Sequence, residues 1–600
     1  MLRKKRRQVA ALHSASREIL TSDFWLLISE FIRVNWCDSR APENSAYFYA
    51  LRCNRPFLIE IAPFVTHKID NNGKLLRFGW WALAAIVFGL VILIRIRLLG
   101  IPLERDEGEY AYAGQLMLQG IPPYKFAYNM KFPGTYAAYA VIMSIFGQTI
   151  TGIHLGLLLV NAASIVLIFF LGRRLVNYTA GIAAAVSYAV LSVSPSVLGF
   201  AGHATHFVML PVLGGTLLLL HDPSRQRLGR LFAIGLLFGL ALLMKQPAVF
   251  FILFGAIYLI STDVRSGFKL KGILLRSLIF IAGAIFPFGI TCLTLSRAGV
   301  FEQFWFWTID YAGQYGGLVP LGQAPQIFFD SVTEVIGAGW ALWVLAGVGV
   351  VVGLWDHRMR GSIVFLLSFL FCAALALCPG FYFRYHYFIF VLPAVSLLAG
   401  IAISKLSDLL AGRMMAVRFL PLVLLGAALS LPIVRDKKFF FAASPVEACR
   451  MIYPESPFPE SIRIAEYVRD HTSPDDTIAV LGSEPQIYFY SQRHSATGYI
   501  YTYGLMEQQK YARQMQEKMV GEIERARPKY LISVVMNDSW LQRPRSERLI
   551  FTWANEYTAQ NYAAAGFVNI TPTETDYFFG DVPPSVGNLK DYILIYKRNP

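Results

Sequence analysis

Long apolar runs recur throughout residues 78–434 and constrain the fold more than any other feature of the chain. A helix that crosses a bilayer needs ~20 predominantly apolar residues. This region supplies such runs repeatedly, separated by short charged or Gly/Pro-rich breaks. With 55% hydrophobic and only 16% charged residues among 600, the chain is too apolar for an ordinary soluble enzyme. The sequence therefore predicts a mainly α, polytopic helical membrane protein.

Positive charges predict how the chain is oriented. The net charge of +15 comes mainly from the N-terminal "MLRKKRRQ" and the loops between apolar runs, a positive-inside pattern that does not require a nucleic-acid partner. The apolar piece 135–147 is too short for a comfortable span, and the later basic loops become cytoplasmic if it lies along the membrane surface. About eleven spans follow, near residues 78–99, 152–171, 179–199, 204–220, 229–244, 248–261, 273–295, 336–354, 361–378, 386–404 and 417–434.

Three regions are expected. Residues 1–76 are polar and aperiodic, lack a signal-peptide pattern, and are interpreted as a cytoplasmic extension. Residues 77–435 form the multi-pass domain in the cytoplasmic (inner) membrane. Residues 436–600 alternate strand-like pieces ("TIAVLG", "KYLISVV", "YILIYK") with amphipathic helical ones ("SIRIAEYVRDH", "YARQMQEKMVGEIERAR"), which predicts an extracytoplasmic, soluble α/β domain.

The stretch "LERDEGEYAYAG" at 103–114 places four carboxylates directly after the first span: Glu104, Asp106, Glu107 and Glu109. Helix capping is one interpretation, with Asp106 as N-cap, Glu109 three residues on, and Glu104 simply solvated. A cap needs only one acid, however, and neighbours such as Asp106 and Glu107 point about 100° apart on a helix. One carboxylate could accept a proton from an attacking group while the other orients that group.

Cations lie on the same predicted outer face, namely Lys131 in "NMKFPGTY", Lys245 in "LLMKQPAVF" and Arg384 in "RYHYFIFVLP". Interfacial anchoring, snorkelling and an aromatic belt are the alternative explanations for them. Cations at headgroup depth can instead stabilise a leaving phosphate. With the acids, they fit a lipid substrate that carries a phosphate.

Cofactor signals are weak. His203 and His206 in "GHATHF", and His386 beside Arg384, are further candidates for substrate binding. A divalent metal is possible at the first pair, but two histidines three apart at a helix start are more often ordinary polar turn residues. The six cysteines show no CxxC, and there is neither GxxxxGK[ST] nor GxGxxG after a strand. No cofactor is required by these patterns.

Three segments together resemble a known superfamily: "RDEGEYAYAGQLMLQGIPPYKFAYNMKFPGTYAAY", "LLMKQPA" and "RYHYFIFVLPAVSLLAG". Over residues 78–435 the chain resembles the GT-C integral membrane glycosyltransferases, in particular bacterial members related to protein O-mannosyltransferases and the lipid A aminoarabinose transferase. The resemblance implies transfer of a hexosyl or pentosyl group from a polyprenyl-phosphate sugar to a lipid, glycan or protein acceptor at the outer membrane face, with inversion. It also implies juxtamembrane helices in the first outer loop.

The resemblance suggests a role for each candidate residue. Asp106 would be the base, and Glu107 would position the acceptor or support the base. Lys131, Lys245 and Tyr387 match family elements at the donor phosphate, where we also place Arg384. In the aminoarabinose transferase an acid precedes the lysine that matches Lys131, whereas this chain has Met130.

Two other functional classes fit the sequence less well than an enzyme does. A transporter or flippase of a lipid-linked sugar would need charged residues near the middle of the spans, but the ionisable groups here lie mostly at span ends. A membrane-anchored binding protein would work through residues 436–600, yet about eleven spans exceed what an anchor needs. The enzyme interpretation is therefore preferred.

Overall fold

The computed structural model describes residues 71–221, 227–571, 574–580 and 590–600. Residues Ile69–Pro600 form one compact unit. The predicted cytoplasmic extension, 1–76, lies almost entirely outside the described residues. It therefore stays a prediction.

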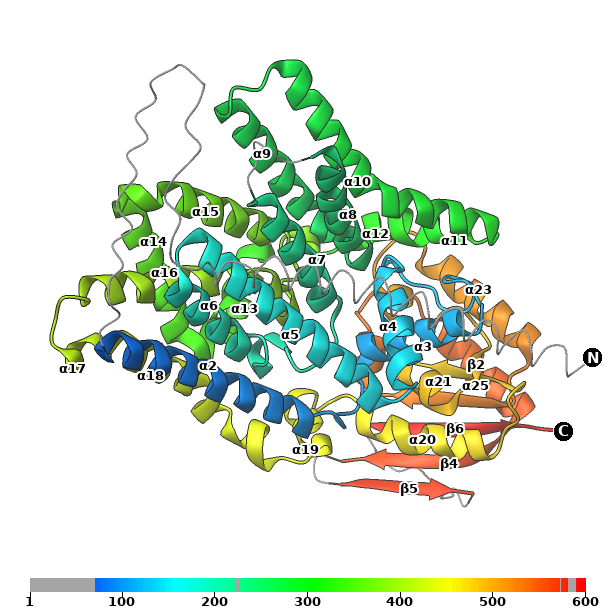
Figure 1. Ribbon diagram of the computed structural model, residues 1–600. Helices are drawn as coiled ribbons and strands as arrows, with labels where there is room; N and C mark the ends of the chain where they lie inside the picture. The colour runs from blue at the N-terminus through cyan, green and yellow to red at the C-terminus, as the bar shows by residue number, and fades with distance from the viewer. Residues whose placement is uncertain (1–70, 222–226, 572–573, 581–589) are drawn as a thin grey trace, which may run out of the picture. The chain divides into compact units, whose positions relative to one another are not determined.

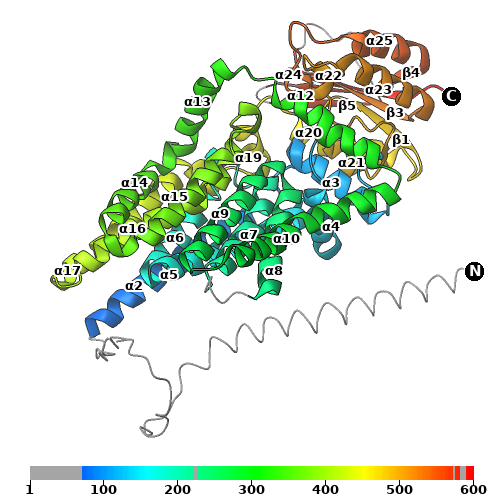
Figure 2. The ribbon, with the colours of Figure 1, turned by 90° about the horizontal axis from the view of Figure 1, so that it is seen from above.

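The predicted apolar spans all coincide with helices, which gather on one side of the described unit (Figures 1 and 2). These helices are α2 (Asn71–Arg97), α5 (Ile150–Leu175), α6 (Tyr178–Leu191), α7 (Ala204–Leu219), α8 (Leu228–Met244), α9 (Val249–Arg265), α10 (Leu270–Arg297), α14 (Trp340–Trp355), α15 (Arg360–Leu375), α16 (Leu392–Leu409) and α18 (Leu420–Arg435).

Among the described residues, 7 helices are long and apolar enough to cross a membrane. A bent pair, Leu321–Ile336 with Trp340–Trp355, would make 8. Helices α6, α7 and α8 are shorter apolar helices, so the predicted count of eleven is not confirmed. Many large apolar side chains on α2 and α10 are exposed, among them Ile86 and Leu278, as expected for faces in contact with lipid.

Close helix packing depends on small residues. A Cβ at Gly235 of α8 would overlap the carbonyl oxygen of Phe280 in α10, and one at Gly349 of α14 would overlap that of Leu398 in α16. Glycine at these crossings lets the two backbones touch, which is typical of helix packing in membranes. These contacts hold the helices that carry the outer loops.

Shorter helices lie in the connections between the apolar helices. The first connection holds α3 (Arg105–Leu118) and α4 (Gly134–Phe146), and α4 matches the predicted surface helix in position and length. Further along the chain lie α11 (Phe301–Trp305), η4 (Phe306–Tyr311), α12 (Ala312–Gly316), α13 (Ala324–Ile336), η8 (Pro379–Phe381), η9 (Tyr385–Phe390) and α17 (Met415–Arg418).

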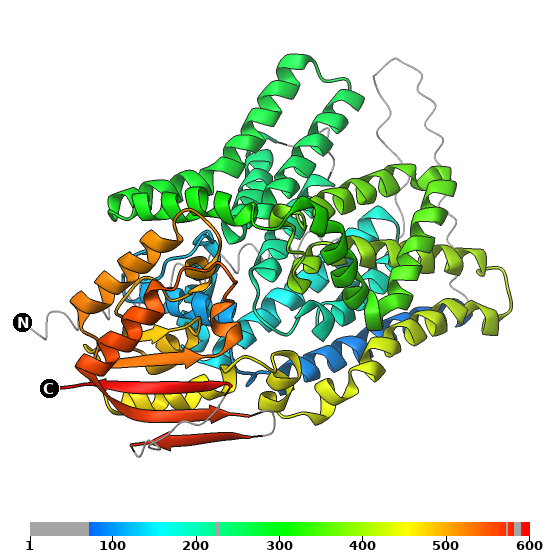
Figure 3. The same ribbon diagram turned by 180° about the vertical axis from the view of Figure 1, so that it is seen from behind.

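The C-terminal region is built on a 6-stranded sheet in the order β2-β1-β3-β6-β4-β5. Strands β2, β1 and β3 are parallel, whereas β6 pairs antiparallel with β3 and β4, and β4 pairs antiparallel with β5. The red and orange-red arrows in Figure 3 are β4, β5 and β6, which form one side of the sheet. The strands are β1 (Thr477–Leu481), β2 (His494–Ser495), β3 (Tyr530–Val535), β4 (Tyr562–Ile570), β5 (Thr575–Phe579) and β6 (Tyr592–Arg598). The helices are α19 (Pro445–Ile452), α20 (Phe458–Asp470), α21 (Gln486–Ser491), α22 (Tyr503–Met506), α23 (Ala512–Ala526), α24 (Asn537–Trp540) and α25 (Leu549–Asn561).

These elements agree with the sequence analysis, because the three predicted strands coincide with β1, β3 and β6 and the two predicted helices with α20 and α23. The division of the chain at 435/436 stays a prediction. The C-terminal region packs tightly on the first outer connection: the Tyr490 hydroxyl accepts from Leu103 N at 2.9 Å, and the Tyr112 hydroxyl accepts from Ser495 N at 2.8 Å.

The contact between α3 and α21 yields a stability prediction. A Cβ at Gly108 would lie 2.7 Å from the backbone nitrogen of Gln486, so Gly108→Ala forces the two helices apart. We expect a cost of about 1–3 kcal/mol, seen as a lower melting temperature of the detergent-solubilised protein.

Gly521→Ala is the matched control, because a Cβ at this helical glycine of α23 meets nothing within 4 Å. Alanine there should be neutral or stabilising by up to ~1 kcal/mol. Equal melting temperatures for the two variants would contradict the proposed tight contact.

Candidate active site

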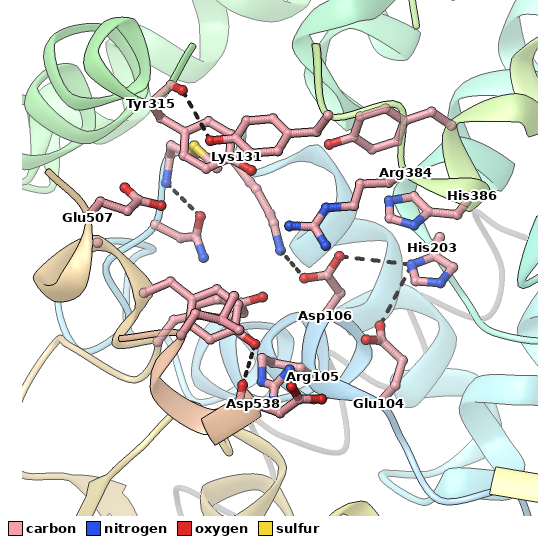
Figure 4. A pocket seen from close by; sticks show the side chains of 18 of the residues that line it. Glu104, Arg105, Asp106, Lys131, His203, Tyr315, Arg384, His386, Glu507 and Asp538 are labelled. Atoms are coloured by element: carbon pink, nitrogen blue, oxygen red, sulfur yellow. Dashed lines mark hydrogen bonds and ion pairs between the residues drawn. The ribbon is translucent and has the colours of Figure 1, made fainter. Parts of the chain in front are cut away.

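A cavity of about 520 Å³ lies where several connections between the apolar helices meet the C-terminal region (Figure 4). Its wall includes the start of α3, the loop before α4, the turn after α8 and the segment before α16. The segment before α7, the connection that holds η4, α12 and α13, and the C-terminal region supply the remaining wall. Residues far apart in the chain therefore share one space.

Helix α3 begins differently from the prediction. Glu104 is the N-cap, with its Oε1 accepting from Glu107 N at 2.9 Å, while the Glu107 side chain accepts from Glu104 N in a capping box. The predicted cap at Asp106 is wrong, as is the solvated Glu104, which is 7% exposed. The backbone at Glu104 is still extended, and the helix starts two residues earlier than expected. Asp106 lies inside the first turn, and its carboxylate is free to face the cavity.

Lys131 joins two of the four acids. Its Nζ lies 2.8 Å from Asp106 Oδ1 and 2.6 Å from Glu109 Oε2. The carboxylate of Glu109 is buried and also accepts from Asn129 Nδ2 at 2.8 Å and from the Tyr136 hydroxyl at 2.5 Å. Glu109 is therefore an anchor for the lysine, while Asp106 presents the same ion pair to the cavity.

Charges around the pair set its protonation. Burial opposes ionisation of Asp106, but Lys131 and then His203 outweigh it and hold the pKa of Asp106 well below its usual range. Burial likewise opposes the charge on Lys131, yet Asp106 and Glu109 raise the pKa of this ammonium well above its usual value. Both groups are therefore ionised at neutral pH.

Glu107 turns away from the cavity. Its Oε1 accepts from Gly202 N at 2.6 Å and lies 3.1 Å from His154 Nε2, and the side chain is fully buried. It does not line the cavity. It fixes the backbone immediately before His203 instead, and so ties α3 to the start of α7.

The four residues predicted at the donor phosphate all line the cavity: Lys131, Lys245, Arg384 and Tyr387. Lys245 lies between α8 and α9 with its Nζ 4.0 Å from the centre of the Tyr387 ring. Burial lowers the pKa of Lys245 to about 7, against the opposing effect of Asp106. Figure 4 shows Arg384 and Lys131 both directed toward Asp106.

His203 pairs with His386 and not with His206, its neighbour in the expected turn. His203 stacks on His386 with ring centres 4.0 Å apart, and both line the cavity, whereas His206 is buried and does not. His203 Nδ1 lies 3.7 Å from Glu104 Oε1 and 3.9 Å from Asp106 Oδ2.

Asp106, His203 and His386 offer ligand atoms within 4.8 Å of one another. Within the described part of the chain, neither ring nitrogen of His203 has a hydrogen-bond partner. One carboxylate and two imidazoles form a donor set that fits Zn²⁺ or a similar divalent ion. Such an ion would act as a Lewis acid beside the Asp106–Lys131 pair.

One wall of the cavity was not predicted from the sequence. Tyr499, Tyr501, Tyr503, Glu507 and Asp538 line it from the C-terminal region. The alternation in "YIYTYG" at 499–504 could have indicated that three tyrosines share one face. Nothing in the sequence indicated that this face meets Asp106.

A substitution of Lys131 tests how much its ion pairs with Asp106 and Glu109 stabilise the loop before α4. Lys131→Met removes the cation that pairs with Glu109, whose side chain is only 1% exposed. We expect a loss of about 3 kcal/mol, measured as a lower melting temperature in detergent, because breaking one side of a buried pair strands the other charge. Adding Glu109→Gln to Lys131→Met should restore part of the loss.

Lys125→Met is the control, because Lys125 lies in the same loop and is exposed, with its ammonium 5.5 Å from the centre of the Phe126 ring. This variant should melt like the wild type. A Lys131→Met protein that also melts like the wild type would contradict the anchoring role.

Comparisons with known proteins agree with the fold. Residues 131–290 match the family model described as dolichyl-phosphate-mannose-protein mannosyltransferase. No curated protein matches the chain in sequence. ArnT from Cupriavidus metallidurans in the apo state is 13% identical, with a TM-score of 0.53, and the match covers 87% of this chain and 98% of ArnT.

The same ArnT bound to undecaprenyl phosphate gives 14% identity, a TM-score of 0.51 and coverage of 88% and 98%. An Archaeoglobus fulgidus oligosaccharyltransferase matches at 14% identity with a TM-score of 0.47, over 83% of this chain and 72% of that one. The two ArnT matches and the family model confirm the predicted resemblance to the GT-C fold: the chain has the fold of ArnT, and its residues 131–290 are similar to the dolichyl-phosphate-mannose-protein mannosyltransferases.

Proposed function

We propose that the chain is an inverting glycosyltransferase that moves a sugar from a polyprenyl-phosphate donor to an acceptor at the outer face of the cytoplasmic membrane. One observation carries the proposal: the ionised Asp106 carboxylate faces a cavity whose wall also holds Lys131, Lys245 and Arg384. A carboxylate beside three cations is the set of groups that this reaction needs. The donor class is supported by the ArnT structure with undecaprenyl phosphate and by the description of the matching family.

The cations bind the donor phosphate. Arg384 can contact two phosphate oxygens at once, and Lys131 and Lys245 add point charges on the same group. As the bond between the anomeric carbon and the phosphate oxygen breaks, the phosphate takes the electron pair. The three cations then stabilise the growing negative charge, which lowers the barrier.

Asp106 accepts the acceptor's proton. The acceptor oxygen or nitrogen attacks the anomeric carbon from the face opposite the phosphate, and its proton passes to Asp106 as the new bond forms. A donor phosphate beside Lys131 shares the ammonium and weakens its hold on Asp106. The pKa of Asp106 then rises, so donor binding makes the carboxylate a better base.

Glu107 acts as a positioning residue in this proposal. Through Gly202 and His154 it fixes the backbone that carries His203, and through the capping box it fixes the turn that carries Asp106. The histidines His203 and His386 shape the cavity beside Asp106. The C-terminal α/β region lies on the same outer face in this arrangement.

Asp106→Asn tests the base directly. The amide is nearly isosteric and keeps the fold, but it cannot take up the proton. We expect transfer to fall by at least ~100-fold, the lower range for removing a general base, in an assay with a polyprenyl-phosphate sugar. Asp470→Asn, at an exposed aspartate of α20, should keep full activity. Near wild-type transfer by Asp106→Asn would exclude the assigned role.

Loss of the positive charge on Lys245 should lower the activity at basic pH. Since its pKa is about 7 in the free protein, the cation is present below pH 7 and is lost as the pH rises through this value. We expect kcat/KM for the donor to fall as the pH rises above about 7, because kcat/KM reports groups of the free enzyme.

Lys245→Arg should move this decline to a much higher pH, because a guanidinium stays charged. The pH profiles of the two proteins, measured with the same donor, make the comparison. The same decline in both would show that another group causes it.

A further inference from the structure

We propose that the C-terminal wall of the cavity is the acceptor subsite and that it binds an uncharged saccharide. This inference rests on the proposed function. The wall consists of Tyr501, Tyr503 and Glu507 from the C-terminal region, with Tyr315 and Tyr382 from the outer connections, and we call it the tyrosine wall.

The tyrosine wall begins beside the reacting groups. The ring centre of Tyr501 lies 5.5 Å from Lys131 Nζ, which itself pairs with Asp106. A molecule lying on Tyr501 therefore reaches Asp106 with its leading hydroxyl. The tyrosine wall borders the donor site, because the Arg384 guanidinium lies 5.6 Å from the centre of the Tyr382 ring. Once the donor phosphate occupies the cations, the wall is the part of the cavity left for the second substrate.

The wall offers aromatic faces in two orientations. Tyr501 and Tyr503 stand at 87° with ring centres 4.8 Å apart, while Tyr315 and Tyr382 are stacked at 18° and 4.6 Å. All four rings are only partly buried. A pyranose ring has apolar C–H faces and a polar rim, and such a flat amphipathic body packs well against rings that also carry hydroxyls.

Carboxylates supply the polar part of the site. Glu507 accepts from the Tyr311 hydroxyl through Oε2 at 2.7 Å and is 8% exposed, and Asp538 lines the same cavity. Carboxylate oxygens accept strong hydrogen bonds from sugar hydroxyls. Their negative charge disfavours an acceptor that carries a phosphate or carboxylate at this end.

Arg105 does not neutralise the carboxylates for a ligand. Its Nε donates to the Ser483 carbonyl at 2.7 Å, and its guanidinium packs between the rings of Phe458 and Tyr503 at 5.3 and 5.2 Å. It also pairs with Glu484 at 3.4 Å. Arg105 thus holds Tyr503 in place and links the wall to the residue next to Asp106.

The lining favours a saccharide over a peptide. One common way to hold an extended peptide is by main-chain hydrogen bonds to an exposed sheet edge. The described residues that line this cavity include none from β1 to β6. Its volume of about 520 Å³ falls in the ~300–1,000 Å³ range of small-molecule sites.

Binding can be measured without transfer. Saturation-transfer NMR on the full-length protein in detergent would use three probes: a neutral disaccharide such as cellobiose, glucuronic acid, and a serine-rich peptide. We expect transfer to the C–H protons of the disaccharide and at least tenfold weaker binding by Glu507→Gln. The control Glu517→Gln, an exposed carboxylate of α23 paired with Arg513, should bind like the wild type.

The outcomes separate the two proposals. Unchanged disaccharide binding by Glu507→Gln, equal binding of glucuronic acid, or binding of the peptide alone would overturn the saccharide subsite. None of these results touches the role of Asp106. Conversely, an active Asp106→Asn protein would overturn the proposed mechanism while the disaccharide binding at Glu507 still stood.

Discussion

The site depends on the two ion pairs that the ammonium of Lys131 forms with Asp106 and Glu109. The carboxylates of Asp106 and Glu109 would repel each other where little water reaches them. The buried ammonium of Lys131 pairs with both and offsets this repulsion. The pair also joins the loop before α4 to the first turns of α3. In the proposed mechanism the same ammonium is shared with the donor phosphate, so the contact that stabilises the loop also sets the basicity of Asp106.

The four acids of residues 103–114 have four different roles. Glu104 caps α3, Glu107 binds Gly202 and His154, Glu109 anchors Lys131, and Asp106 alone of the four offers its carboxylate to the cavity beside a cation. Each pairing depends on the helix starting at Arg105. A start two residues later, as the capping prediction had it, would rotate every one of these carboxylates away from its partner.

Much of the scaffold could be predicted from the sequence, because apolar runs and alternating patterns are local. The helices along the predicted spans, the surface helix at 134–146 and strands such as β3 follow from periodicity alone. The resemblance placed Asp106, Lys131, Lys245 and Tyr387 in one site, to which the residue chemistry added Arg384, and all five line one cavity.

What could not be predicted depends on contacts between distant segments. His203 meets His386 across 183 positions only because the start of α7 and η9 pack together. The tyrosine wall depends on the C-terminal region folding back onto α3, where Gly108 touches Gln486. The N-cap was missed for a different reason, since two acids two residues apart can both cap a helix and only burial decides between them.

The proposed mechanism is a single displacement at the anomeric carbon, in which Asp106 takes the acceptor's proton and the phosphate leaves. The most direct test is the anomeric configuration of the sugar released from a polyprenyl-phosphate donor of known configuration, read by proton NMR at early times, before mutarotation. A single displacement gives the inverted anomer. A product that keeps the donor's configuration would contradict it, since retention requires a second displacement or a different attacking face.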